Sequence, residues 1–260
     1  MERVTAAPTS LSLQRYAPQL LVLLVGAGAA WAFTVDRARG MGGMPGTMGM
    51  DLLAFIAMWG LMMTAMMLPS AAPFAALYGR TFDSRPVRRT IEFVGGYLLV
   101  WTLIGVPAFG LAWLAGEAAR AQPAVGTALA VTVFAVAGLY QLTSLKYRCL
   151  SHCRTPMGDM IHYASYRGPL RDLRVGAHRG LFCFSCCWSL MALMAAFGFM
   201  NLWAMVAIAT IVAIEKLWSR GEAFGRFTGG VALVLAIVVI FVPDVAPGLA
   251  GSGLAAGVMD

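Results

Sequence analysis

Long uninterrupted apolar stretches alternate along the chain with short segments rich in arginine, glycine and polar residues. Several of them reach the roughly 18 to 20 residues that a helix needs to cross the hydrocarbon core of a bilayer. They are continuous rather than alternating, which favours transmembrane helices over the strands of a β-barrel. The pattern predicts an all-α polytopic transmembrane helix bundle with about seven spans, at residues 18–34, 52–78, 91–114, 125–145, 181–199, 202–217 and 231–242.

Prolines, glycines and one asparagine set several of these boundaries. The apolar run 181–217 is too long for one span, and "GFMN" at 198–201 offers a turn within it. Asn201 is suited to cap the helix that follows. Pro69 and Pro73 are expected to kink the second span and to free backbone carbonyls inside the membrane.

The first apolar stretch also has features of a secretory signal peptide, and its removal would leave six spans. The tripeptide "AWA" at 30–32 resembles a small-x-small cleavage site. The preceding region is only weakly basic, however, and Trp31 lies inside the candidate site. We therefore expect a retained membrane anchor.

The composition agrees with a membrane protein and argues against nucleic-acid binding. Of the 260 residues, 60% are hydrophobic and 12% are charged, whereas a soluble domain has roughly 25% charged residues. The formal net charge is +7. No basic–aromatic motif accompanies this charge, and arginine in the loops of a membrane protein reflects topology. The expected surroundings are the lipid bilayer.

The distribution of lysine and arginine predicts the orientation. With seven spans, all but three of the 19 Lys and Arg residues lie on one side, the exceptions being Arg37, Arg39 and Arg120. The positive-inside rule makes that side cytoplasmic in a multi-pass protein of the cytoplasmic membrane. The chain then has a cytoplasmic N-terminus at 1–17, one transmembrane domain at 18–243 with a cytoplasmic loop at 146–180, and a flexible Gly/Ala tail at 244–260.

All cysteines fall near the predicted cytoplasmic face, where a reducing cytosol keeps thiols free. The spacing of four residues within "CLSHC" and within "CFSCC" places pairs of sulfur atoms on one face of a helix. Met191 extends the second stripe, and His152 lies close to the first. Soft thiolate and thioether ligands select Cu(I). The candidate metal ligands here are Cys149, Cys153, Cys183, Cys186, Cys187, Met191 and His152.

Methionine is concentrated in two neighbouring segments. The Gly-rich loop "MGGMPGTMGM" on the predicted outer side carries Met41, Met44, Met48 and Met50, which could acquire a metal ion there. In the second span, Met62 and Met66 are spaced by four residues and could bind the same ion within the membrane. The alternative for both segments is ordinary packing, because methionine fills irregular gaps well.

Glu215 stands at the end of the sixth predicted span, in "AIEKLW". It could form an ion pair with the adjacent Lys216 at the membrane interface. Alternatively, it could supply charge to a metal ion or accept protons from thiols. An ionisable residue in a membrane segment is a candidate functional residue in either case.

Three of these motifs resemble the DUF2182 family of predicted metal-binding integral membrane proteins. They are "WGLMMTAMMLPSAAP" at 59–73, "YQLTSLKYRCLSHCRTP" at 140–156 and "GLFCFSCCWSLMALMAAFGFMNLWAM" at 180–205, followed by "EKL". The resemblance covers roughly residues 50–220. Ser185 stands where that family typically has glycine. The resemblance implies a metal-binding role for the five cysteines but supplies no mechanism.

Together these features predict a protein that binds, moves or delivers a soft transition metal, with Cu(I) as the leading candidate. A soluble metal chaperone or metalloprotein is the expected partner. The chain has no G-x-x-x-x-G-K-[ST] phosphate loop, so an ATP-driven pump within it is not expected, and the pattern leans away from an enzyme. Two alternatives stay open: a thiol–disulfide relay, and a scaffold subunit with a structural Zn²⁺ ion held by four thiolates.

Overall fold

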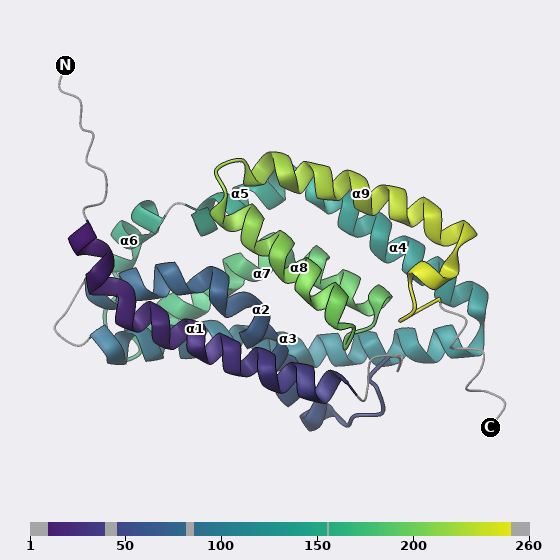
Figure 1. The fold of residues 1–260 in the computed structure, drawn as a ribbon, viewed down its shortest axis with the longest axis horizontal. Helices are drawn as coiled ribbons and strands as arrows, with labels where there is room; N and C mark the ends of the chain where they lie inside the picture. The colour runs from purple at the N-terminus through teal and green to yellow at the C-terminus, as the bar shows by residue number, and fades with distance from the viewer. Residues whose placement is uncertain (1–9, 40–45, 82–85, 155, 251–260) are drawn as a thin grey trace, which may run out of the picture.

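The computed structural model describes residues 10–39, 46–81, 86–154 and 156–250, and within them every regular element is helical. The predicted all-α class is confirmed. The elements are α1 (Ser10–Ala38), α2 (Leu52–Thr81), α3 (Pro86–Ala121), α4 (Pro123–Leu142), α5 (Ser144–Arg154), α6 (Pro156–Ala164), α7 (Arg171–Phe197), α8 (Leu202–Leu217), α9 (Gly221–Phe241) and a 3-10 turn, η1 (Pro243–Val245) (Figure 1).

Six of the described helices are long and apolar enough to cross a membrane: α1, α2, α3, α4, α7 and α9. The chain is therefore a multi-pass membrane protein. The predicted sixth span is α8, which has 16 residues. At about 1.5 Å per residue it is roughly 24 Å long, shorter than the roughly 30 Å hydrocarbon core. Helix α8 runs back alongside α7 and contacts α2, α5 and α9 within the bundle.

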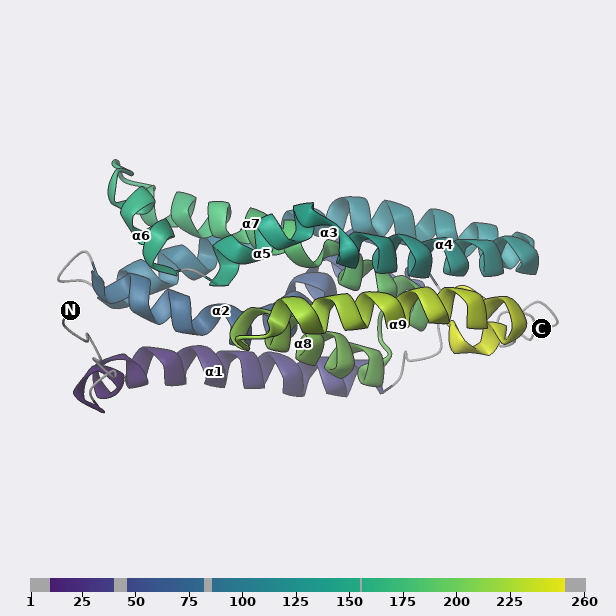
Figure 2. The same ribbon diagram turned by 90° about the horizontal axis from the view of Figure 1, so that it is seen from above.

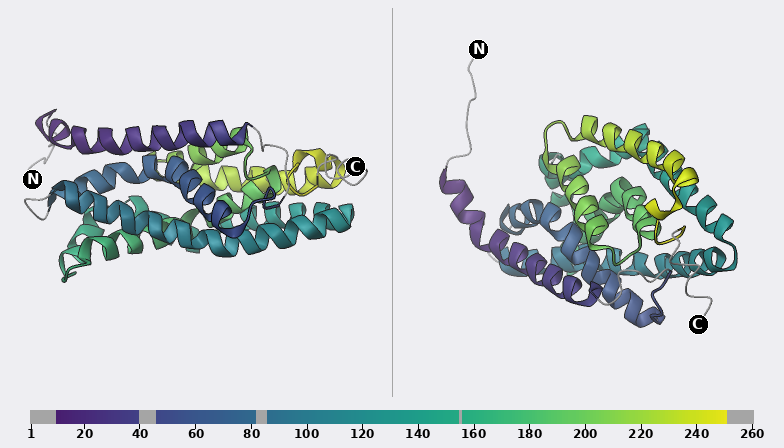
Figure 3. Two further views of the ribbon diagram at one scale, coloured as in Figure 1. Left: turned by 90° about the horizontal axis from the view of Figure 1, so that it is seen from below. Right: turned by 45° about the vertical axis from the view of Figure 1, so that its right-hand side comes forward.

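The long helices run up and down one common axis. Figure 2 shows the start of α1, the end of α2, the start of α3, and α6 toward one end of the bundle. Helices α3 and α4 meet at the opposite end (Figure 2). Helix α1 lies at the edge of the bundle, packed along α2 (Figure 3). The side of the membrane that each end faces stays a prediction from the distribution of Lys and Arg.

The segment predicted as a cytoplasmic loop, 146–180, is mostly helical. It contains most of α5, all of α6 and the first turns of α7. Helix α5 packs against α7 and α8. This packing brings the cysteines of α5 to the side of α7 that carries the other three.

Glycines allow α3 and α7 to approach closely. A Cβ atom at Gly96 would lie 2.0 Å from the carbonyl oxygen of Leu173, and one at Gly176 would lie 1.9 Å from that of Phe93. Small residues at a membrane helix interface permit such backbone contact. The contact places Tyr97 of α3 against Cys183 of α7.

The turn between α7 and α8 has the expected cap. The side chain of Asn201 accepts a hydrogen bond of 3.2 Å from the N–H of Ala204, and Gly198 adopts φ of 92°. The beginning of the predicted tail packs nearby, since Ala246 and Leu249 are buried and the N–H of Gly248 donates to Ala196. The remainder of the tail, 251–260, lies outside the described residues, as do most residues of the N-terminal segment 1–17.

The glycine contact yields a test of the α3–α7 packing. Gly96→Ala should lower stability by about 1–3 kcal/mol, the usual cost of overpacking, because its methyl group would meet the backbone of Leu173. Gly95→Ala is the matched control on the same helix, since nothing lies within 4 Å of its Cβ position. Thermal unfolding in detergent should separate the two variants, and equal midpoints would contradict this packing.

Candidate metal centre

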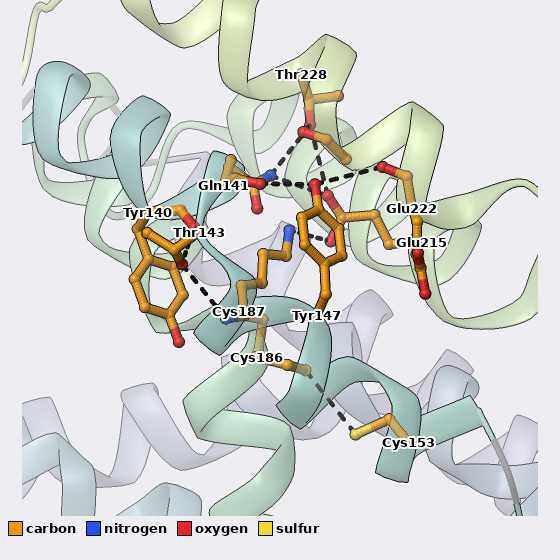
Figure 4. Close-up of polar contacts among 12 residues, drawn as sticks. Tyr140, Gln141, Thr143, Tyr147, Cys153, Cys186, Cys187, Glu215, Glu222 and Thr228 are labelled. Carbon is orange, nitrogen blue, oxygen red and sulfur yellow. Dashed lines mark hydrogen bonds and ion pairs between the residues drawn. The ribbon is translucent and has the colours of Figure 1, made fainter.

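Two cysteines from different helices meet in the bundle. The Sγ atoms of Cys153 on α5 and Cys186 on α7 are 3.9 Å apart (Figure 4). Two sulfur atoms bound to one ion at about 2.3 Å cannot be more than roughly 4.6 Å apart. The Cys153–Cys186 pair therefore fits around a single metal ion without rearrangement of the helices.

Cys186 stands at the centre of the sulfur cluster. Its thiol contacts that of Cys153, and it lies on the same helix as Cys183 and Cys187. It also donates to the carbonyl oxygen of Cys183 at 3.1 Å, as does the thiol of Cys187 at 2.8 Å. Cys183, Cys186 and Cys187 are all buried, whereas Cys153 is half-buried.

Cys183 has two polar neighbours from other helices. Tyr97 Oη on α3 lies 2.9 Å from Cys183 Sγ, and Lys216 Nζ on α8 lies 3.0 Å from it. The expectations from the sequence did not include Tyr97, and they placed Lys216 beside Glu215. A lysine within an apolar run was the available signal, because charged residues in membrane segments mark functional sites.

The two cysteines of α5 differ in environment. A hydrogen bond with Cys186 lowers the pKa of the Cys153 thiol, and the charges of Lys216 and Arg179 act in the same direction against the effect of burial. Burial raises the pKa of the Cys149 thiol, and within the described residues this thiol makes no hydrogen bond. Since metals bind the thiolate, Cys153 is the better candidate ligand.

Arg179 ties the end of α5 to α7. Its guanidinium donates to the carbonyl oxygens of His152 at 2.5 Å and Cys153 at 2.9 Å, and it pairs with Asp159. The ring of His152 stacks on Phe182, and its Nδ1 lies 3.2 Å from Asp159 Oδ1. The His152 side chain thus contacts a carboxylate and an aromatic ring, while the backbone beside it helps to position Cys153.

The candidate methionines lie in the same apolar core as the buried cysteines. Met62 and Met66 of α2 and Met191 of α7 are all buried there. Met48 is also buried in this core, and Met50 packs against it. Met41 and Met44 lie outside the described residues. Burial of these side chains suits packing and thioether coordination equally.

Glu215 pairs with a lysine of another helix. Its Oε1 accepts from Gln141 Nε2 at 2.9 Å (Figure 4). Its Oε2 accepts from Lys146 Nζ at 2.7 Å. Of the two alternatives that the sequence left open for Glu215, the ion pair with Lys216 is not formed, because the carboxylate pairs with Lys146. Adjacent residues on a helix do not face each other, so Glu215 and Lys216 point to different partners, and Lys216 reaches Cys183.

A cavity of about 300 Å³ opens beside the sulfur cluster. Its lining includes Cys153, Cys183, Lys216 and Ser70. This volume is at the lower end of the range for small-ligand sites, about 300–1,000 Å³. Through this cavity an incoming ion can reach the thiols of Cys153 and Cys183.

The donors favour a soft ion with few ligands. Within the part of the chain that the structure describes, no group of three or more His, Cys, Asp or Glu side chains is arranged to hold a metal ion. A structural zinc ion needs four such ligands, which this arrangement does not supply. Thiolates and thioethers are ligands for soft ions such as Cu(I).

Comparison with known proteins gives one informative result. Residues 56–239 match the family described as "PpoB2: Copper chaperone". The match begins within α2, ends in α9 and contains all five cysteines as well as Lys216 and Glu215. No curated protein and no solved structure matches the chain. Because the match covers well over half of its length, the chain belongs to the PpoB2 copper chaperone family.

Proposed function

We propose that this protein binds Cu(I) between the thiols of Cys153 and Cys186, with the neighbouring Cys183 as a further candidate sulfur donor, and delivers it to a soluble metal chaperone or metalloprotein. The observation that carries the proposal is the 3.9 Å approach of Cys153 and Cys186 from two helices, in a member of a copper chaperone family. The cysteines implied by the DUF2182 resemblance include these three. The distribution of Lys and Arg supports placing the cluster at the cytoplasmic face.

Delivery would proceed by exchange of sulfur ligands. Cys153 is half-buried and lines the cavity, so it can meet an incoming ligand first. A thiolate of the partner replaces one protein thiolate on the ion, and the remaining protein thiolates then leave in turn. The ion stays Cu(I) throughout, and no electron is transferred.

The methionines of α2 provide a route between the cluster and the other end of the bundle. Met62 and Met66 share the apolar core with the buried cysteines and with Met48. A bare cation in hydrocarbon is very costly, and neutral thioethers reduce that cost for a soft monovalent ion. We include them in the proposal as transient ligands, with Met41, Met44, Met48 and Met50 acquiring the ion on the outer side. Glu215 forms an ion pair with Lys146, so we do not propose it as a metal ligand.

One observation also supports a second candidate, the thiol–disulfide relay. The Cys153–Cys186 separation of 3.9 Å could close to a disulfide bond of about 2.05 Å by side-chain rotation. In such a step the two thiols together would lose two electrons and two protons, and a disulfide-bearing partner would accept them and become two thiols. The relay predicts no stoichiometric metal, which separates it from the copper proposal.

The first test removes one sulfur at a time from purified, reduced protein. Cys153→Ser and Cys186→Ser should each weaken Cu(I) binding by more than about 100-fold, since losing a ligand should exceed the roughly 10–100-fold effect of disturbing its supporting contacts. Cys149→Ser is the matched control and should bind normally. Competition with a colorimetric Cu(I) chelator measures the affinity.

The same samples discriminate among the alternatives by metal analysis. Unchanged copper affinity in both Cys153→Ser and Cys186→Ser would rule out the thiol site. Zinc in place of copper would support the scaffold. A disulfide between Cys153 and Cys186 without stoichiometric metal would support the relay.

A second test addresses the methionines of α2. Met62→Leu and Met66→Leu conserve volume, so each should cost less than about 1.5 kcal/mol of stability while removing a thioether. Copper delivery, measured as the metal content of a copper-dependent acceptor in cells, should fall in both variants. Met205→Leu, at another buried core position, is the control. Equal copper delivery in all three variants would show that the α2 methionines serve only in packing.

A further inference from the structure

A second cavity lies where α5 meets the start of α9. Its volume is about 750 Å³, well within the range of small-ligand sites, about 300–1,000 Å³. It is lined by Ser151, Arg154, Ser219, Arg220, Glu222, Ala223 and Arg226. The three arginines and the one glutamate leave the lining with a net charge of +2. The cavity is therefore suited to a negatively charged group.

Two of these arginines are held in place by contacts between helices. The Nη2 atom of Arg154 donates to the carbonyl oxygens of Trp218 at 2.7 Å and Ser219 at 2.8 Å, in the turn between α8 and α9. The Cζ atom of Arg226 lies 5.3 Å from the centre of the Tyr147 ring of α5. Guanidinium groups bind phosphate oxygens in a bidentate manner. Holding them in place before binding lowers the entropy cost of capturing such a ligand.

The length of α9 sets the level of the cavity relative to the bilayer. This helix is apolar enough to cross a membrane and has 21 residues. It is therefore roughly 31 Å long, close to the roughly 30 Å thickness of the hydrocarbon core. Its first turn then lies at the level of the lipid headgroups. The exposed Trp218 beside it agrees with this level, because tryptophan is enriched at membrane interfaces.

An apolar face of α9 leads from the cavity into the membrane. Ala223 lines the cavity, and Phe227, Val231 and Val234 follow it on the same side of the helix at steps of four, four and three residues. All three of these larger side chains are exposed. An acyl chain can lie along this face while its headgroup occupies the cavity. A soluble acidic protein would match the arginines but would have no use for the apolar face.

We infer that this cavity binds the headgroup of an anionic phospholipid, whose acyl chains lie along α9. Every phospholipid offers a phosphate to the arginines. A zwitterionic headgroup also carries a cation, which the net positive lining disfavours. The turn between α8 and α9 falls on the predicted cytoplasmic side, where basic groups near the membrane meet anionic lipids. This inference goes beyond the proposed copper function and does not depend on it.

The test compares two lipids that share their acyl chains and differ in headgroup charge. Purified protein in detergent is titrated with phosphatidylglycerol or phosphatidylcholine, and native mass spectrometry measures the affinity of the first bound lipid. Wild type should prefer phosphatidylglycerol by at least tenfold. The double variant Arg220→Gln/Arg226→Gln should reduce this preference by at least fivefold, because basic groups supply the attraction. Arg154 stays unchanged, since it also lines the cavity beside the sulfur cluster.

Two controls separate lipid recognition from damage to the fold. The double variant Arg167→Gln/Arg174→Gln removes the same charge from exposed positions outside the cavity and should keep the wild-type preference. Glu222→Gln removes the negative charge of the lining and should increase the preference, an effect that misfolding would not produce.

Three results would overturn the inference. Equal affinity of wild type for both lipids would leave the basic surface to a soluble acidic partner. An unchanged preference in Arg220→Gln/Arg226→Gln would place the bound lipid elsewhere. Displacement of phosphatidylglycerol by an equal concentration of inorganic phosphate would indicate a site for the free anion instead of a lipid.

Discussion

The attachment of α5 to α7 through Arg179 is the interaction on which the candidate site depends. The guanidinium donates to the carbonyl oxygens of His152 and Cys153, at the end of α5 where the backbone has no helical partner for them. It also lies 4.0 Å from the centre of the Phe74 ring of α2. With its pairing to Asp159 of α6, Arg179 joins α7 to three other helices, and its contact with the backbone of Cys153 helps to hold that thiol opposite Cys186.

Two buried lysines, Lys146 and Lys216, illustrate how differently a charge can be used in an apolar interior. Lys146 meets a carboxylate, Glu215, and Gln141 adds a hydrogen bond, so this group forms a closed polar contact between α4, α5 and α8. Lys216 meets a thiol and a hydroxyl beside a cavity. The first arrangement satisfies its own charges, whereas the second leaves sulfur donors available for an ion.

Close backbone packing supplies the precision that this arrangement requires. The α3–α7 contact at Gly96 and Gly176 fixes Tyr97 next to Cys183. Side-chain packing around the cysteines is apolar and rich in methionine, so few hard oxygen donors compete for a bound ion. The same features that stabilise the bundle therefore also favour a soft metal over a hard one.

The sequence by itself determined the class of protein, most of the membrane helices and the set of sulfur atoms, because hydrophobic length and residue type are local properties of the chain. It also indicated the cap at Asn201 and the turn before α8. Only the tertiary structure decided that Cys153 meets Cys186, that Glu215 binds Lys146, and that Lys216 reaches Cys183. These partners are separated by 33 to 69 residues, and their contacts follow from the rotation and packing of whole helices, which no local pattern records.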